Sequence, residues 1–213
     1  NIYKFFDQIK DDLGVRKSSF IKIFKYLDDL KGPINIVETG CLRIKDNYSG
    51  DGQSTLLFDK YTLSREPGSK VYTVDIDQNA TKICKSVVSE NVEVNTGDSV
   101  KYLVELMKRL KKENKKVSLF YLDSFDVDWQ SSDRSAAHHL KELTAIINYI
   151  SEETMVVVDD APVFVPMKIE NNKYQKVGCA GRIVSFTETG DGRYLITLEG
   201  VSRFNFKSEV EHK

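Results

Sequence analysis

The chain has 213 residues, 40% of them hydrophobic and 30% charged, and a formal net charge of −1. This balance is typical of a globular protein, and the net charge near zero gives no reason to expect nucleic acid as a partner. A membrane is not expected either, since no stretch approaches the roughly 20 apolar residues of a membrane span. Cys41, Cys84 and Cys179 are isolated and odd in number, which argues against a disulfide framework or a thiolate zinc site and, without a signal-peptide pattern, favours a reducing cytoplasm.

After two helical patterns within residues 1–31, the predicted elements alternate between short apolar strands and amphipathic helices. Strands are predicted at 34–37, 70–74, 92–95, 117–122 and 155–158. Helices are predicted between them, at about 54–61, 78–88, 99–113 and 135–150. Short, continuously apolar strands of this kind are typical of a parallel sheet covered on both faces. The predicted fold class for residues 1–165 is therefore α/β, a doubly wound, Rossmann-like parallel sheet with helices on both faces.

Two of these helices have a recognisable apolar face. In the helix at 99–113 the expected face is Val100, Leu103, Val104, Met107 and Leu110. In the helix at 135–150 it is Leu140, Leu143, Ile147 and Ile150. About 100° per residue then places His139 on the inward edge of the second face and His138 nearly opposite. Because histidine accepts protons near neutral pH, His139 is the candidate catalytic base; a metal or substrate contact and a purely structural residue are the alternatives.

Polar residues follow every predicted strand, where ligands bind in sheets of this class. They are Glu38 and Gly40 after the first strand, Asp75 and Asp77 after the second, Gly97, Asp98 and Ser99 after the third, Asp123, Asp126 and Asp128 after the fourth, and Asp159 and Asp160 after the fifth. Polar residues also end strands for purely structural reasons. Carboxylates nevertheless recur after all five strands, which favours a ligand site at this edge.

The stretch "VETGCLRIKDNYSGDGQST" at residues 37–55 resembles a glycine-rich ligand loop with a polar interruption. No lysine follows Gly52, which excludes a phosphate-binding P-loop, and Thr55 stands where the dinucleotide pattern has its third glycine. An acid after the second strand can accept both hydroxyl protons of a ribose, and exposed amides at a helix start can bind a carboxylate. The loop therefore suits a ligand with a ribose and an amino-acid portion better than one with a pyrophosphate.

The motifs "VETG", "VDID", "NTGDS", "LDSFD" and "VVVDD" resemble, in this order, those of class I S-adenosylmethionine-dependent methyltransferases over residues 33–162. The most similar group has a split "ETG…GDGQST" first motif and a terminal "DD". The resemblance implies S-adenosylmethionine as cofactor, with Glu38, Gly40 and Gly52 around its methionine portion, Asp75 at its ribose, and Asp98 and Ser99 beside its adenine. Residues 42–49 are an insertion relative to the compact glycine loop of most members, and their role stays open.

Three carboxylates, Asp123, Asp159 and Asp160, should converge at one edge of the sheet, where they would repel unless a cation lies among them. A hard divalent ion with oxygen ligands, Mg²⁺ above all, suits them. The arrangement is similar to that of metal-dependent O-methyltransferases of the catechol and macrolide-sugar groups, which implies that these three residues are the metal ligands. The alternative is that one residue of the Asp pair caps a helix and that Asp123 lies in a turn.

Residues 166–213 have a different pattern. The "GDG" at 190–192 lies between two alternating, β-rich runs and predicts a hairpin. Residues 174–206, with "VGCAGRI" and "DGRYLITL", closely resemble part of the N-terminal substrate-binding domain of Lon-type proteases, a PUA-like β-fold. The other strands of that domain have no counterpart in the chain.

The predicted domains are therefore a methyltransferase-like domain, 1–165, and a partial Lon-type β segment, 166–213. The predicted function is metal-assisted O-methylation of a small molecule or sugar hydroxyl. The alternative is a non-catalytic protein-binding module of the Lon N-terminal type, or an inactive fragment that joins the two. The acceptor and the oligomeric state, a homo-oligomer included, are left open by the sequence.

Overall fold

The computed structural model describes residues 2–14, 16–50, 53–126 and 133–159 and, beyond them, the backbone of strands within 162–205. The chain divides into two compact units: Asn1–Phe125 with His139–Asp159, and Asp126–His138 with Asp160–Lys213. The predicted boundary at residue 165 remains a prediction. In the described part of the chain, no helix has both the length and the apolar character that a membrane crossing requires.

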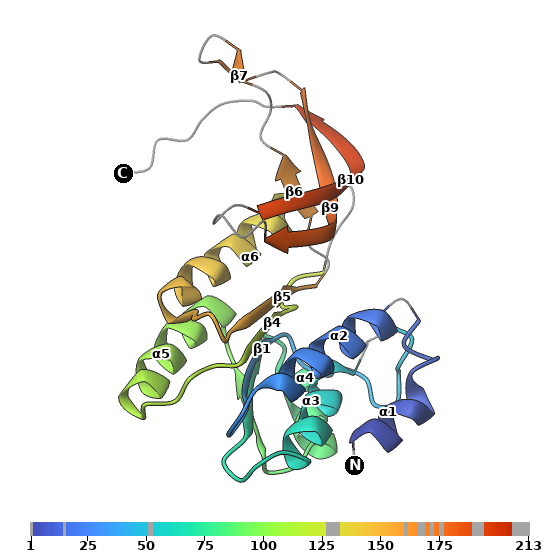
Figure 1. Ribbon diagram of the computed structural model, residues 1–213, viewed down its shortest axis with the longest axis vertical. Helices are drawn as coiled ribbons and strands as arrows, with labels where there is room; N and C mark the ends of the chain where they lie inside the picture. The colour runs from blue at the N-terminus through green and yellow to red at the C-terminus, as the bar shows by residue number, and fades with distance from the viewer. Residues whose placement is uncertain are drawn as a thin grey trace. The chain divides into compact units, whose positions relative to one another are not determined.

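The first unit is built on a five-stranded, all-parallel sheet with the strand order β3-β2-β1-β4-β5 (Figure 1). Its strands are β1 (Asn35–Thr39), β2 (Lys70–Asp75), β3 (Val92–Thr96), β4 (Leu119–Leu122) and β5 (Met155–Val158). Its helices are α1 (Ile2–Ile9), α2 (Arg16–Asp29), α3 (Ser54–Leu63), α4 (Gln78–Val87), α5 (Ser99–Lys112) and, from His139 onward, α6 (Asp133–Ile146), with the 3₁₀ turn η1 (Ile147–Tyr149) after α6. The α/β prediction and its doubly wound parallel sheet are confirmed.

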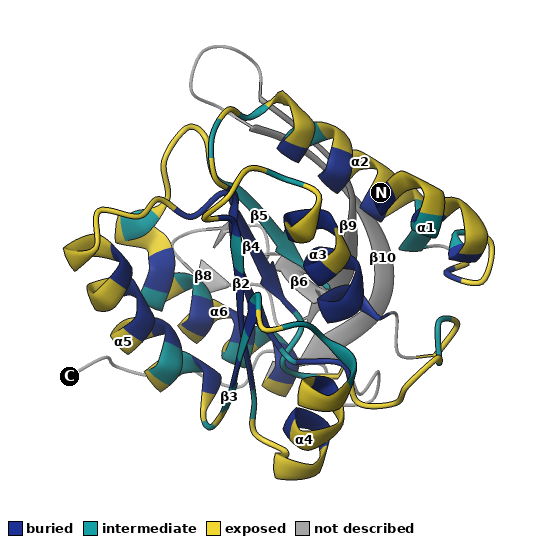
Figure 2. Cartoon of the chain, turned by 90° about the horizontal axis from the view of Figure 1, so that it is seen from below, coloured by how far each residue is buried: buried dark blue, intermediate teal, exposed yellow. Residues whose placement is uncertain are grey.

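Helices cover both faces of this sheet because successive side chains of each strand point to opposite sides. Ile36 packs with α1, α2, α3 and α4, whereas its neighbour Val37 packs with α5 and the end of α6. Along β4, Tyr121 contributes to the first cluster and Phe120 to the second. Figure 2 shows the resulting pattern, with buried strands between helices whose outer sides are exposed. The core therefore consists of two layers separated by the sheet.

An aromatic cluster joins the N-terminal helices to the sheet. The Phe24 and Tyr61 rings are stacked with centroids 5.2 Å apart, and Phe20 stacks on Tyr121 at 6.1 Å. The predicted apolar face of α2 is confirmed by the burial of Phe20, Ile23, Phe24 and Leu27. The two N-terminal helices thus extend the core on the face that carries Ile36.

Two predicted helix faces are wrong in part. In α5, Leu106 is buried and Val104 is 37% exposed, because the helix rests on the sheet along Leu103, Leu106, Met107 and Leu110. In α6, Leu140 and Ile147 are 64% and 63% exposed, whereas His139 and Glu142 are buried. The inward position expected for His139 is confirmed, but its helix buries polar residues together with the apolar Ile146 and, in part, Leu143.

The second unit contains antiparallel strands. Its three-stranded sheet has the order β10-β9-β6, with β6 (Pro162–Val165), β9 (Val177–Glu188) and β10 (Tyr194–Asn205). A two-stranded pair, β7 (Ile169–Glu170) with β8 (Lys173–Tyr174), completes the described strands. Glu188 pairs with Tyr194 at the end of the β9–β10 ladder, so the predicted hairpin is confirmed, while residues 190–192 lie outside the described residues.

Candidate cofactor and catalytic site

Gly40 lies where the strand order reverses, between the carboxyl ends of β2 and β4, which flank β1. Its backbone is left-handed with φ 79°, and its N–H donates to the Val74 carbonyl at 2.8 Å. A Cβ at this position would stand 2.1 Å from the Asp123 carbonyl oxygen. Glycine is required here because the turn after β1 passes directly over the backbone that follows β4. Ligands bind at such a crevice in open α/β sheets.

Asp75, the last residue of β2, is fixed against this turn. One carboxylate oxygen, Oδ2, accepts the Cys41 backbone N–H at 3.1 Å, and Oδ1 accepts the Asp77 backbone N–H at 2.8 Å. Each carboxylate oxygen can accept a second hydrogen bond, so Asp75 retains acceptor capacity for ligand hydroxyls. The structure therefore brings Asp75 and Gly40 together, as the sequence predicts for the first two motifs.

Glu38, the carboxylate of the first motif, is fully buried. β1 extends to Thr39, two residues beyond the predicted end, so that Glu38 lies within the sheet and is paired in register with Thr73. Its Oε2 accepts the hydroxyls of Thr55 and Thr73, both at 2.7 Å. Burial raises the pKa of Glu38 to about 7, although hydroxyl donors from Thr55, Ser54 and Thr73 oppose this effect.

The insertion at 42–49 is held at both ends. At its start, the Leu42 N–H donates to the Thr55 hydroxyl at 3.0 Å, which itself donates to Glu38. Further along, the Gln53 side-chain amide donates to the Ile44 carbonyl at 2.6 Å, and the Arg16 guanidinium donates to two carbonyls at the end of the loop. The loop is therefore tied to the start of α3 and to α2. Gly52, predicted to contact the cofactor, lies outside the described residues.

The third motif lies beside the second. The Gly97 N–H donates to the Asp75 carbonyl at 3.0 Å, which joins the turn after β3 to the end of β2. Asp98 is exposed and caps α5, accepting the Lys101 N–H at 2.9 Å, as an aspartate at an N-cap usually does. Ser99 is buried and donates its hydroxyl to Glu142.

Glu142, on α6, is fully buried and gathers polar groups from several elements. Its Oε1 accepts the Ser124 hydroxyl at 2.6 Å, and its Oε2 lies 2.9 Å from His139 Nδ1. Together with the Ser99 hydroxyl, these donors lower the pKa of Glu142 although burial alone would raise it. His139 is 4% exposed, so the candidate base is a buried imidazole held by a buried carboxylate.

The carboxylates after β4 and β5 occupy neighbouring strand ends. Leu122 and Val158 are paired in register, and the Asp159 N–H donates to the Leu122 carbonyl at 2.9 Å, so Asp123 and Asp159 follow side by side. The Tyr121 hydroxyl donates to Asp159 Oδ2 at 3.1 Å. Within the described residues no group of three His, Cys, Asp or Glu side chains is arranged to hold a metal ion, and Asp160 lies outside them. The Mg²⁺ site stays a prediction.

Sequence reasoning missed the partners of the predicted residues. Glu142 follows His139 by three positions, a spacing that brings two side chains together on one helix face and could have been recognised. Thr55 and Thr73 could not have been recognised, because the sheet register brings Thr73 to Glu38 and the packing of α3 on the sheet brings Thr55 there. Ser124 carried no signal apart from its position after Asp123.

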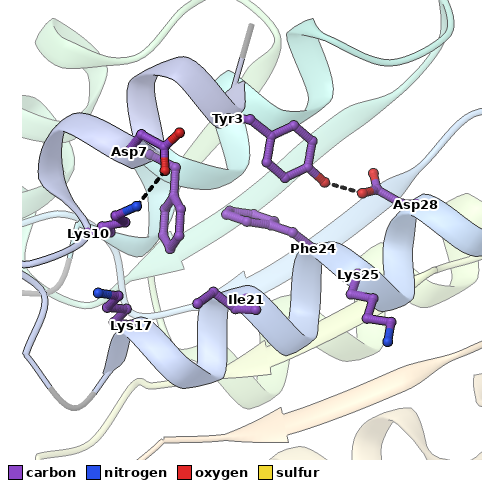
Figure 3. Close-up of a pocket in the computed structure, with 9 residues that line it drawn as sticks. Tyr3, Asp7, Lys10, Lys17, Ile21, Phe24, Lys25 and Asp28 are labelled. Carbon is purple, nitrogen blue, oxygen red and sulfur yellow. Dashed lines mark hydrogen bonds and ion pairs between the residues drawn. The ribbon is translucent and has the colours of Figure 1, made fainter.

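A hollow of about 380 Å³ between α1 and α2 contains none of the predicted site residues (Figure 3). Phe6 and Phe24 meet edge to face beneath it, with ring centroids 5.5 Å apart. At its rim Lys10 forms an ion pair with Asp7 at 2.7 Å. Two of the charged groups at this hollow therefore neutralise one another, and the hollow contributes no residue to the site described above.

No protein-family model matches the chain, and no curated protein matches it in sequence. Among solved structures the chain is similar to a short-chain dehydrogenase/reductase from Saccharomyces cerevisiae, with 15% sequence identity and a TM-score of 0.42. The similarity covers 59% of this chain and 52% of the other, so the chain spans about half the length of that structure. This likeness concerns the fold alone.

Proposed function

We propose that the chain is an S-adenosylmethionine-dependent methyltransferase that acts on a hydroxyl group of a small molecule or sugar. The main support is the position of Asp75, whose carboxylate accepts a hydrogen bond from the Cys41 N–H. This contact lies next to the glycine turn, at the point where the strand order reverses. A carboxylate at this position can accept both ribose hydroxyls, and the sequence of the loop lacks the third glycine that a pyrophosphate would favour. The order of the motifs, from Glu38 to Asp160, supports the same assignment.

In the proposed reaction the cofactor supplies the methyl group, already activated by its bond to a positively charged sulfur. The chain then has to bind the acceptor in line and to remove its hydroxyl proton. His139 is the proposed proton acceptor, since its imidazole is held at the carboxyl edge of the sheet by Glu142. Asp98 and Ser99 would border the adenine, and Glu38 would lie beneath the methionine portion.

Mg²⁺ is the proposed second cofactor, bound by Asp123, Asp159 and Asp160. The adjacency of the ends of β4 and β5 supports two of these ligands, because Asp123 and Asp159 directly follow strand residues that are paired in register. An Mg²⁺ ion held there would lower the pKa of a bound acceptor hydroxyl. Isothermal titration of the chain with Mg²⁺ tests this directly. Asp159→Ala should abolish Mg²⁺ binding while the affinity for S-adenosylmethionine is kept, and unchanged Mg²⁺ binding would refute the assignment.

Cofactor identity is tested by calorimetric titration with S-adenosylmethionine, S-adenosylhomocysteine and NAD in parallel. Asp75→Ala should weaken S-adenosylmethionine binding by at least tenfold, since a charged hydrogen-bond pair contributes roughly 1.5 to 3 kcal/mol. Asp77→Ala is the matched control, because Asp77 follows the same strand but caps α4 through the Asn79 N–H. Binding of NAD in place of S-adenosylmethionine would overturn the proposal.

A separate role is proposed for residues 174–206, as a protein-binding segment similar to the Lon N-terminal domain. The antiparallel pairing of β9 with β10 favours it, since that domain is a β-fold. Fluorescence anisotropy with a labelled unfolded polypeptide tests the full chain for this activity. Absence of binding at micromolar concentrations would remove this second candidate.

A further inference from the structure

Glu142 is a buried carboxylate that binds groups from three separate parts of the first unit. The Ser99 hydroxyl comes from the start of α5, the Ser124 hydroxyl from the segment after β4, and the His139 imidazole from the preceding turn of the same helix. Two of these positions, Ser99 and His139, were predicted from sequence to be functional. A single side chain at 0% exposure therefore connects the adenine side of the site with the proposed base.

The charge of Glu142 determines whether His139 Nδ1 carries a hydrogen. Its pKa is lowered by hydrogen bonds from His139, Ser124 and Ser99, which outweigh the effect of burial, so the group is ionised at neutral pH. An ionised carboxylate only accepts hydrogen bonds. The 2.9 Å contact with His139 Nδ1 must then be an Nδ1–H donation. In the neutral imidazole this leaves the lone pair on Nε2.

We propose that Glu142 is the positioning residue of the proposed methyltransferase site: it fixes His139 in the Nδ1–H tautomer, with Nε2 as the proton-accepting atom, and orients the Ser99 and Ser124 hydroxyls. This inference rests on the proposed function for the identity of the reaction. During transfer, the acceptor oxygen gives its proton to Nε2 and forms a bond to the methyl carbon. The carbon–sulfur bond breaks at the same time, and its electron pair stays on sulfur. Glu142 then stabilises the imidazolium that results.

The tautomer can be read by two-bond ¹H–¹⁵N correlation spectroscopy of histidine-labelled protein at pH 8.5, without any substrate. Signals are assigned with His139→Gln and with His138→Gln, the matched control on the same helix. The expected result for His139 is the Nδ1–H form. A neutral Nε2–H form, or an imidazolium that persists at pH 8.5, would overturn the proposal. This measurement on the unaltered chain needs no variant of Glu142 to fold.

Glu142→Gln replaces one acceptor oxygen with an N–H₂ donor. The Nδ1–H form should be lost in favour of the Nε2–H form, because the new donor can bind Nδ1. Glu105→Gln, at an exposed position on α5, is the control and should leave the spectrum of His139 unchanged. An unchanged Nδ1–H signal in folded Glu142→Gln protein would overturn the positioning role.

Cofactor titration separates this inference from the proposed function. If the unaltered chain does not bind S-adenosylmethionine, the methyltransferase assignment fails, whereas the tautomer result still reports on Glu142. If it binds, Glu142→Gln should weaken the affinity by about two- to tenfold, because the reoriented Ser99 hydroxyl would lose one neutral hydrogen bond to the cofactor, worth about 0.5–1.5 kcal/mol. Loss of the Nδ1–H form of His139 in a Glu142→Gln variant that still binds S-adenosylmethionine is a result that a purely structural role would not produce.

Discussion

Glu38→Gln should change how the stability of the protein depends on pH. The pKa of Glu38 is raised from its ordinary value of 4.5 to about 7 in the folded chain. Between these values the unfolded chain has lost the proton that the folded chain still binds, so stability falls as pH rises through this window. At about 1.36 kcal/mol for each pH unit, the full loss is about 3 kcal/mol. A glutamine cannot titrate, so the variant lacks this loss.

Urea unfolding of both proteins at pH 4.5 and at pH 8 measures the effect. The difference in unfolding free energy between the unaltered chain and Glu38→Gln should shift by about 3 kcal/mol between the two pH values, with glutamine relatively favoured at pH 8. Glu90→Gln is the control for loss of a carboxylate, because Glu90 is exposed in the turn after α4. A difference that stays constant to within about 1 kcal/mol would refute the reasoning.

Three further substitutions test the geometry of the first unit by equilibrium unfolding. Gly40→Ala should cost about 2 to 5 kcal/mol, from the left-handed backbone and from the contact of its Cβ with the backbone after β4, whereas Gly32→Ala, with a similar φ of 82° and open space, should cost only the backbone term; equal costs would exclude the close approach. Phe24→Ala should cost about 3 to 5 kcal/mol because its ring is 1% exposed, while Ile21→Ala on the exposed side of α2 should cost under about 1 kcal/mol. Tyr121→Phe should cost about 1 kcal/mol through loss of its hydrogen bond to Asp159, and a neutral effect would show that this bond does not contribute.

The sheet could be predicted because its strands are buried on both faces. Segments such as "LFYL" and "MVVV" contain no charged residue and no small polar residue, and this pattern is typical of strands that helices cover on both sides. The end of β1 was predicted two residues too early, since Glu38 and Thr39 are polar. Inside the sheet, Glu38 Oε2 accepts the hydroxyls of Thr55 and Thr73, which lie 17 and 35 residues further along the chain, so no local rule could have extended the strand.

The site could be predicted only residue by residue. Asp75 and Gly40 were placed correctly together because the carboxyl ends of neighbouring parallel strands meet at one edge. The buried face of α6 was predicted wrongly at Leu140, because apolar spacing was read without regard to polar residues that form a network. Once His139 and Glu142 satisfy one another, burying them costs less than their polarity suggests, and Leu140 becomes exposed on the other side.

The pKa values of the two buried carboxylates of the candidate site are shifted in opposite directions, and their hydrogen-bond donors explain why. Glu38 has uncharged hydroxyl donors and the negative Asp75 nearby, so burial prevails and its pKa rises to about 7. Glu142 has an imidazole that can share positive charge as well as two hydroxyls, and its pKa falls. Glu38 points to the face of the sheet that α3 covers, where Thr55 donates to it. Glu142 lies on α6, which packs on the opposite face. A site that separates two carboxylates in this way has one group able to carry a proton near neutral pH and another that stabilises a cation. In the proposed reaction, proton transfer from a hydroxyl to His139 would require the second of these, which would give the ionised Glu142 a chemical role beyond filling the core.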